Sequence, residues 1–134
     1  MHCTPYLYFK GNCETALQFY AGLGLGGMAE AMRYAGTPMA EHAGAGWEDK
    51  LLHVLFEGPG VKFYAADGPD AETMKGCALL LEPDDAVAGA ALFEALSAGG
   101  LVTVPFTLQF WGDHYGNFTD RFGVQWAMNC RGAK

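Results

Sequence analysis

Charge is scarce in this chain of 134 residues, and basic charge is the scarcest. There are 8 Lys and Arg against 15 Asp and Glu, so the net charge is -7, and charged residues make up only 17% of the chain. Tight binding to a nucleic-acid backbone needs clustered Lys and Arg, and the composition therefore argues against nucleic acid as a partner. The apolar share of 51% supplies a packed core and argues against a disordered chain.

Paired cysteines and long apolar runs are also missing. The four cysteines are widely spaced and form no CxxC pair. Together with the lack of a signal-peptide pattern, this is typical of reduced thiols in a cytoplasmic protein. Residues 86–106 carry a single charge, but three glycines and a proline interrupt them. We expect a soluble helix and a strand there, and no membrane partner.

What the chain does contain is one pattern of elements that occurs twice. In the first half we expect a helix that begins at Cys13, with the Asn12 side chain as its cap. In the second half we expect a helix capped by Asp84 or Asp85. The strands expected in the first half are Pro5–Phe9, Met28–Tyr34, Lys50–Glu57 and Val61–Ala66, with Ala35–Asp49 as a long loop. Those of the second half are Ala78–Glu82, Gly100–Phe110, Gly116–Asp120 and Val124–Asn129.

Two shifts relate the halves. A shift of 73 positions lays the apolar helix residues Cys13, Leu17, Tyr20 and Leu23 on Ala86, Ala90, Phe93 and Leu96. A shift of 63 lays residues 60–66 on residues 123–129. Two coincidences in the correct order predict an α+β fold built from a duplicated βαβββ module, with module one at 4–67 and module two at 73–130. Because each sheet needs a partner to bury its face, we expect a single domain over 1–134.

Alternation along the matched strands predicts two faces. We expect one apolar set to pack under the helices and the opposite, mixed set to line a wet cavity. The apolar set is Val61, Phe63, Ala65, Val124, Trp126 and Met128, and the mixed set is Lys62, Tyr64, Ala66, Gln125, Ala127 and Asn129.

The duplicated unit, with DRFG at 120–123 before the last strand, resembles the vicinal oxygen chelate superfamily. That superfamily holds glyoxalase I, bleomycin and fosfomycin resistance proteins and extradiol dioxygenases. PYLYFKGNCETALQFY (5–20) and FWGDHYGNFTDRFGVQWAMN (110–129) are similar to its PhnB-like branch, often labelled 3-demethylubiquinone-9 3-methyltransferase. The resemblance implies a cup-shaped mixed sheet, as in glyoxalase, bleomycin resistance and dihydroxybiphenyl dioxygenase folds, and usually a homodimer.

The resemblance also implies where a metal would lie. Metal-dependent members place His, Glu or Gln at four inward strand positions, which correspond here to Pro5, Tyr64, Cys77 (or Ala78) and Ala127. These are poor ligands for a hard divalent ion, and catalytic metals usually keep about three protein ligands. We therefore expect no metal and no cofactor, with a divalent metal recruited at other positions as the alternative.

The candidate catalytic residues are two histidines. His53 lies in the apolar run LLHVLFE and is either a core histidine or an acid–base group in the cavity. His114 belongs to residues 111–116, which form either a bend bounded by glycines or, through Trp111, His114 and Tyr115, the rim of a cavity.

Other polar residues are assigned to ligand binding or to turns. Tyr64 belongs to the cavity-lining set, and Gln109 and Asn129 either offer donors and acceptors to a ligand or face water at strand ends. We expect Asp120 to hold the DRFG turn. The register implied by the resemblance points Pro5, Leu7 and Phe9 toward the cup and leaves Tyr6 and Tyr8 beneath the helices.

The glycine-rich run GLGLGG (22–27) imitates a nucleotide-binding loop, but such loops follow a strand and open a helix. Here the run follows a helix and precedes a strand, and the chain is too short for the parallel sheet of an S-adenosylmethionine fold. We therefore expect the methyltransferase label not to describe this protein.

Two functional hypotheses remain open. The first is a small-molecule-binding protein of the superfamily, a cytoplasmic homodimer whose activity is unassigned. The second is an enzyme of lyase, isomerase or dioxygenase type that uses His53 or His114 as acid–base groups. A purely structural partner is a third class.

Overall fold

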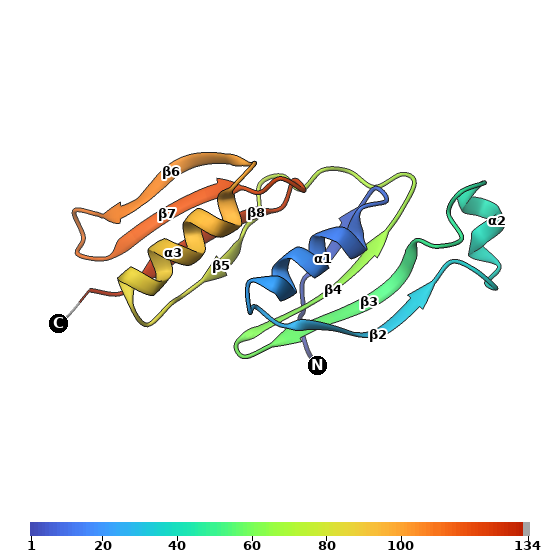
Figure 1. Ribbon diagram of the computed structural model, residues 1–134, viewed down its shortest axis with the longest axis horizontal. Helices are drawn as coiled ribbons and strands as arrows, with labels where there is room; N and C mark the ends of the chain where they lie inside the picture. The colour runs from blue at the N-terminus through green and yellow to red at the C-terminus, as the bar shows by residue number, and fades with distance from the viewer. Residues whose placement is uncertain (133–134) are drawn as a thin grey trace. The chain divides into compact units, whose positions relative to one another are not determined.

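Each half of the chain lays one long helix against a face of a four-stranded sheet (Figure 1). The computed structural model describes residues 1–132. Unit one is Met1–Thr73, and unit two begins at Met74. Unit one contains β1 (Tyr6–Phe9), α1 (Cys13–Gly22), β2 (Gly27–Arg33), α2 (Met39–Ala43), β3 (Leu51–Gly58) and β4 (Val61–Asp67). Unit two contains β5 (Leu79–Leu81), α3 (Ala86–Ser97), β6 (Leu101–Leu108), β7 (His114–Thr119) and β8 (Gln125–Cys130).

The two sheets have the same topology. Their strand orders are β1-β4-β3-β2 and β5-β8-β7-β6. In each sheet the first strand runs parallel to the last, and the other pairs are antiparallel. This confirms the α+β fold with a duplicated βαβββ module. The single domain predicted for 1–134 stays a prediction, and the segment expected as a plain loop contains the short helix α2.

The core of unit one lies between α1 and the sheet. Leu17 and Tyr20 of α1 are fully buried, and Phe63 of β4 is 1% exposed. Leu7 pairs with Ala65, so both point to this helix-covered face.

The expectation for β1 is therefore wrong. Leu7 and Phe9 are 6% and 4% exposed, whereas Tyr6 and Tyr8, at 38% and 62%, lie on the open face of the sheet. A parallel neighbour fixes which side each residue of a strand faces, and the neighbour here is β4.

Unit two is built in the same way, with one difference in its helix. α3 buries Gly89, Phe93 and Leu96 against the sheet, whereas Ala90, predicted to be on this face, is exposed. A Cβ on Gly89 would lie 2.8 Å from Pro83 Cγ and 3.4 Å from Met128 Sδ. The missing side chain thus lets the helix approach the sheet closely, and this rotates the buried face toward Gly89.

Two buried aspartates hold the ends of strands in place. Asp67 Oδ1 accepts hydrogen bonds from the backbone N–H groups of Gly11 (3.0 Å) and Cys13 (2.9 Å), and its Oδ2 accepts from Leu51 N (3.0 Å). The Asn12 side chain makes no capping hydrogen bond, so the predicted cap is wrong. Asp67, which lies 54 positions after Cys13, accepts the hydrogen bond from the Cys13 N–H instead. The predicted Asp85 cap is confirmed by its 2.9 Å bond from Ala88 N.

Asp120 has the corresponding role in unit two. Its Oδ1 accepts from the backbone N–H groups of Phe122 (2.8 Å) and Val124 (2.9 Å), and its Oδ2 accepts from Trp126 Nε1 (2.9 Å). The predicted role of Asp120 in the DRFG turn is confirmed. Over residues 1–132, no helix combines the length and the apolar character needed to cross a bilayer.

Candidate functional site

The two open sheet faces carry different side chains at equivalent positions. Leu55 pairs with Tyr64 in unit one, and Asn117 pairs with Ala127 in unit two. Tyr64 and Ala127 therefore occupy equivalent positions. They are 63 residues apart, as the internal shift between the two halves predicts. Where unit one carries a phenol ring, unit two carries a methyl group, and space opens above the sheet.

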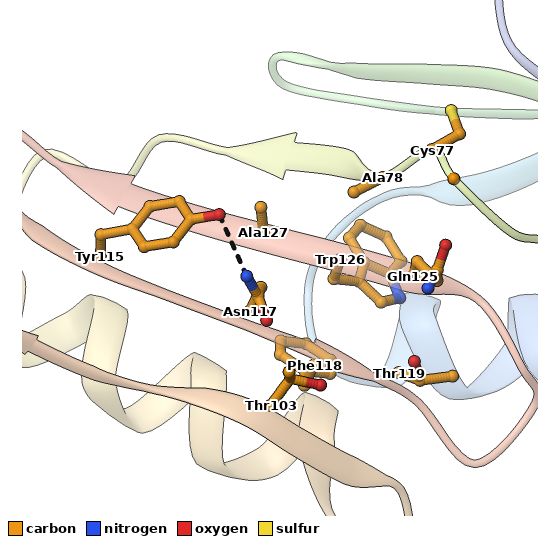
Figure 2. A pocket seen from close by; sticks show the side chains of 11 residues that line it. Cys77, Ala78, Thr103, Tyr115, Asn117, Phe118, Thr119, Gln125, Trp126 and Ala127 are labelled. Atoms are coloured by element: carbon orange, nitrogen blue, oxygen red, sulfur yellow. Dashed lines mark hydrogen bonds between the residues drawn. The ribbon is translucent and has the colours of Figure 1, made fainter.

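That space is a groove of about 380 Å³ on the open face of unit two (Figure 2). Its small residues are Ala127 and, from the segment before β5, Gly76, Cys77 and Ala78. The polar side chains of the lining come from β6, β7 and β8, and Phe118 and Trp126, which are 2% and 1% exposed, complete it. The polar residues are Thr103, Tyr115, Asn117, Thr119 and Gln125. Alternation along β7 and β8 explains this lining, because every second residue points away from α3.

The groove lining is electrically neutral. None of its eleven residues is an Asp, Glu, Lys, Arg or His. Three hydroxyl groups and two carboxamides supply the polar atoms. Asn117 Nδ2 donates to Tyr115 Oη over 3.2 Å, which orients both side chains (Figure 2).

A tyrosine–histidine cluster, made of Tyr6, Tyr8, His53 and Tyr64, occupies the open face of unit one. Tyr6 Oη lies 2.8 Å from His53 Nδ1. The Tyr6 ring stacks on Tyr8 and Tyr64 at centroid distances of 5.1 and 5.9 Å, and His53 stacks on Tyr64 at 5.3 Å. Burial, followed by the neighbouring Tyr8, raises the pKa of Tyr6 above its ordinary value.

The predicted site residues are distributed over several places. Tyr115 lines the groove, and Tyr64 and His53 belong to the tyrosine–histidine cluster. His114 opens β7 and lies against Phe106, at a centroid distance of 5.8 Å, on the side of the sheet that α3 covers. Residues 114–116 are thus strand rather than bend.

The remaining candidates support neighbouring backbone or rings. Gln109 Nε2 donates to the carbonyl oxygens of Thr107 and Tyr115, both over 3.2 Å. Asn129 Nδ2 donates to Asp113 Oδ2 over 3.0 Å. Asn129 also lines a separate cavity of about 310 Å³ with Glu82, Pro83, Asp84 and Arg131. Trp111 is half-exposed, with its ring centroid 6.0 Å from that of Tyr115.

Sequence reasoning did not select Thr103, Asn117 and Thr119 as binding residues. The alternation Tyr115–Asn117–Thr119 was a signal that could have found the two on β7. This alternation is hard to see because residues 111–116 also fit a bend bounded by glycines, which hides the start of the strand. Two of the four positions that the resemblance assigned to a metal line the groove, and they hold three residues: Cys77 (or Ala78) and Ala127.

The groove residues do not fit a divalent metal, because Cys77 is the only strong donor among those three residues. Within residues 1–132, no group of three or more His, Cys, Asp or Glu is placed to hold a metal ion. Cys13 is fully buried, and burial followed by the charge of Asp67 raises the pKa of its thiol, so it is not a reactive thiolate.

Comparisons with known proteins agree with this architecture. The model of the family described as 3-demethylubiquinone-9 3-methyltransferase matches residues 1–129. The crystal structure of protein PA1353 from Pseudomonas aeruginosa is 34% identical, with a TM-score of 0.85 and 99% of each chain covered. A putative 3-demethylubiquinone-9 3-methyltransferase, PhnB protein, from Bacillus cereus is 22% identical, with a TM-score of 0.81 and coverage of 97% of this chain and 99% of that one.

A more distant structure extends the likeness of fold. The bleomycin resistance determinant encoded on transposon Tn5 is 14% identical, with a TM-score of 0.56 and 98% of each chain covered. The duplicated βαβββ topology, the family match and these structures agree. The chain shares the fold of the bleomycin resistance determinant and belongs to the family described as 3-demethylubiquinone-9 3-methyltransferase.

Proposed function

We propose that this protein binds a small, partly apolar molecule in the groove of unit two and does not transform it. The observation that carries the proposal is the groove itself, which is preformed, concave, lined by apolar and hydrogen-bonding groups and free of charged side chains. Its volume of about 380 Å³ lies within the usual range for ligand pockets.

The proposed function does not include the methyltransferase activity that the family description names. The glycine-rich run at 22–27 leads from the end of α1 into β2, whereas a nucleotide-binding loop leads from a strand into a helix. Each sheet is mixed, with one parallel pair, and so differs from the parallel sheet that such a cofactor fold uses.

We further propose a cytoplasmic homodimer. All four cysteines are free thiols, which suits a reducing compartment. The edge strand β6 and the turn after it expose apolar side chains that a second copy would cover: Leu101 is 69% exposed, Leu108 64% and Phe110 95%.

A thermal-shift screen against metabolites and antibiotics tests the binding function, because a ligand that prefers the native state raises the melting temperature. The decisive variant is Ala127→Tyr, which would fill the groove as Tyr64 fills the equivalent position. Ala90→Tyr, on the exposed side of α3, is the matched control.

We expect ligands that stabilise the native protein and the Ala90→Tyr variant to lose at least about tenfold in affinity for Ala127→Tyr, or roughly 1.4 kcal/mol. Thr103→Trp, at the exposed rim, repeats the test should Ala127→Tyr fold poorly. Ligands that bind all variants equally would place the binding site elsewhere and refute the proposal.

The hydrogen bond between Tyr6 and His53 favours a second candidate, an enzyme with His53 as acid–base group. When the phenol donates, Nδ1 accepts and Nε2 carries the ring proton, so the imidazole has one orientation and one tautomer. For any ligand from the screen that is turned over, His53→Ala should abolish turnover with folding intact, whereas His114→Ala should not. Under the binding function, both variants keep ligand affinity within about tenfold.

A further inference from the structure

The hydrogen bond between Asn117 and Tyr115 determines what the groove offers a ligand. Asn117 Nδ2 donates to Tyr115 Oη, so the phenol oxygen already accepts and its own proton is free to be donated outward. Asn117 Oδ1 and the Gln125 carboxamide have no hydrogen-bond partner within residues 1–132. The groove therefore presents a donor and an acceptor side by side, with a second carboxamide nearby.

The same lining disfavours ionised ligands. An anion would find no Lys or Arg, and a cation would find no carboxylate, among the eleven lining residues. Bringing a charge out of water without a partner is costly. The net charge of -7 adds repulsion for anions.

The small residues define the rest of the ligand. Ala78 and Ala127 form an apolar floor, and buried Trp126 lies beside them. A flat apolar body above this floor removes apolar surface from water without displacing a bulky side chain.

We propose that the groove selects uncharged ligands that carry a carboxamide or lactam group on an apolar body. The ligand carbonyl accepts from the Tyr115 hydroxyl, and its N–H donates to Asn117 Oδ1. This inference rests on the proposed binding function and names the ligand class for the same groove. The matched pairing of donor with acceptor gives the selectivity, because a ligand without the amide leaves these half-buried groups unpaired.

Three probes of similar shape test the ligand class: benzamide, benzoate and benzylamine at pH 7. Binding is measured by nuclear magnetic resonance titration that follows the side-chain amide signals of Asn117 and Gln125. We expect benzamide to move both signals and to bind at least about tenfold more tightly than either charged probe.

Two substitutions with a matched control test the residues. Asn117→Asp, followed through the remaining Gln125 signal, should shift the preference from benzamide toward benzylamine. Tyr115→Phe, which keeps the ring, should weaken benzamide binding about tenfold. Asn12→Asp makes the same change on an exposed residue of unit one and should leave all three affinities unchanged.

The outcomes separate the two proposals. If benzoate or benzylamine binds the groove as tightly as benzamide, the ligand class is wrong while the binding function stands. If benzamide does not move the groove signals at all, the ligand class is also wrong. If, in addition, no compound from the screen moves those signals, the groove is not a binding site and both proposals fall.

Discussion

Tyr6 is 38% exposed on the open face of unit one, and its hydroxyl is hydrogen-bonded to His53. Partial burial and the neighbouring Tyr8 raise its pKa above the ordinary value of 10.0. Burial and then Asp67 also raise the pKa of Tyr34, whose hydroxyl donates to the Asp67 carbonyl. Both phenols are therefore held in their neutral form by the folded chain, with consequences for stability at alkaline pH.

We predict that Tyr6→Phe reduces the loss of stability above pH 10. A pKa that is higher in the folded than in the unfolded chain contributes stability that is fully present below the unfolded value. That stability is lost as the pH rises from the unfolded value through the folded one. The free energy of unfolding, measured by urea titration from about pH 9 to 11, should fall less steeply with pH in the variant. The difference in slope should correspond to a fraction of one proton released on unfolding. Tyr34 keeps part of the slope, and equal slopes would contradict the raised Tyr6 pKa.

Residue 127 of the groove and the equivalent residue 64 of the tyrosine–histidine cluster differ strongly in size. The internal shift of 63 positions already matched residue 64 with residue 127, and alternation predicted both on the cavity side of the sheet. That Ala127 leaves a hollow and Tyr64 joins a ring stack depends on their neighbours. His53 and Tyr6 come to Tyr64 from two other strands, which no local pattern specifies.

The position of α3 on its sheet depends on Gly89, which has no side chain. Helical spacing predicts most of its buried face, and Asp85 caps it as expected. The shift of that face from Ala90 to Gly89 is a packing effect, because Gly89 lies against Pro83, Met128 and Phe106. Residues from three other segments decide it.

We predict that Gly89→Ala destabilises the protein although alanine favours helix. The new Cβ would lie 2.8 Å from the rigid Pro83 ring, so α3 must move away from the sheet. Overpacking typically costs about 1–3 kcal/mol, against a propensity gain of about 1 kcal/mol. We therefore expect a net loss of roughly 1 kcal/mol in urea denaturation.

The matched control is Gly22→Ala at the end of α1, where a Cβ would meet nothing within 4 Å. This variant should be neutral or slightly more stable than the native protein. A Gly89→Ala variant as stable as the native protein would show that the close contact with Pro83 does not constrain the helix.

For the whole molecule, the two units unfold either together or independently. Each has its own core and a buried aspartate that holds three N–H groups, Asp67 in unit one and Asp120 in unit two. Each also has a sheet face that its own helix leaves open. Burying such faces is the physical reason to expect a single domain.

We predict that Asp120→Ala lowers the stability of both units by roughly 3 kcal/mol, because two buried donors and one half-buried donor lose their acceptor. Native-state hydrogen exchange at Phe63 in unit one and Met128 in unit two measures this unit by unit. A single domain loses protection at both residues. Asp120→Asn, which keeps one acceptor oxygen, should lose less, and loss at Met128 alone would show that the units unfold independently.

The sequence by itself determined the elements and their repetition. Hydrophobic period, the Asp85 cap and two internal shifts predicted the duplicated βαβββ module, most helix-facing residues of β4 and β8 and the Asp120 turn. These patterns predict the folded structure correctly because propensity and alternation depend on residues that are close together in the chain.

Only the tertiary structure decided which side chains meet. The Tyr6–His53 bond spans 47 positions and the Cys13–Asp67 bond spans 54. The groove exists because strands β6, β7 and β8 and the segment before β5 bring small and neutral polar residues together. Such contacts depend on strand order and register, which are set by the packing of the whole sheet rather than by any one segment.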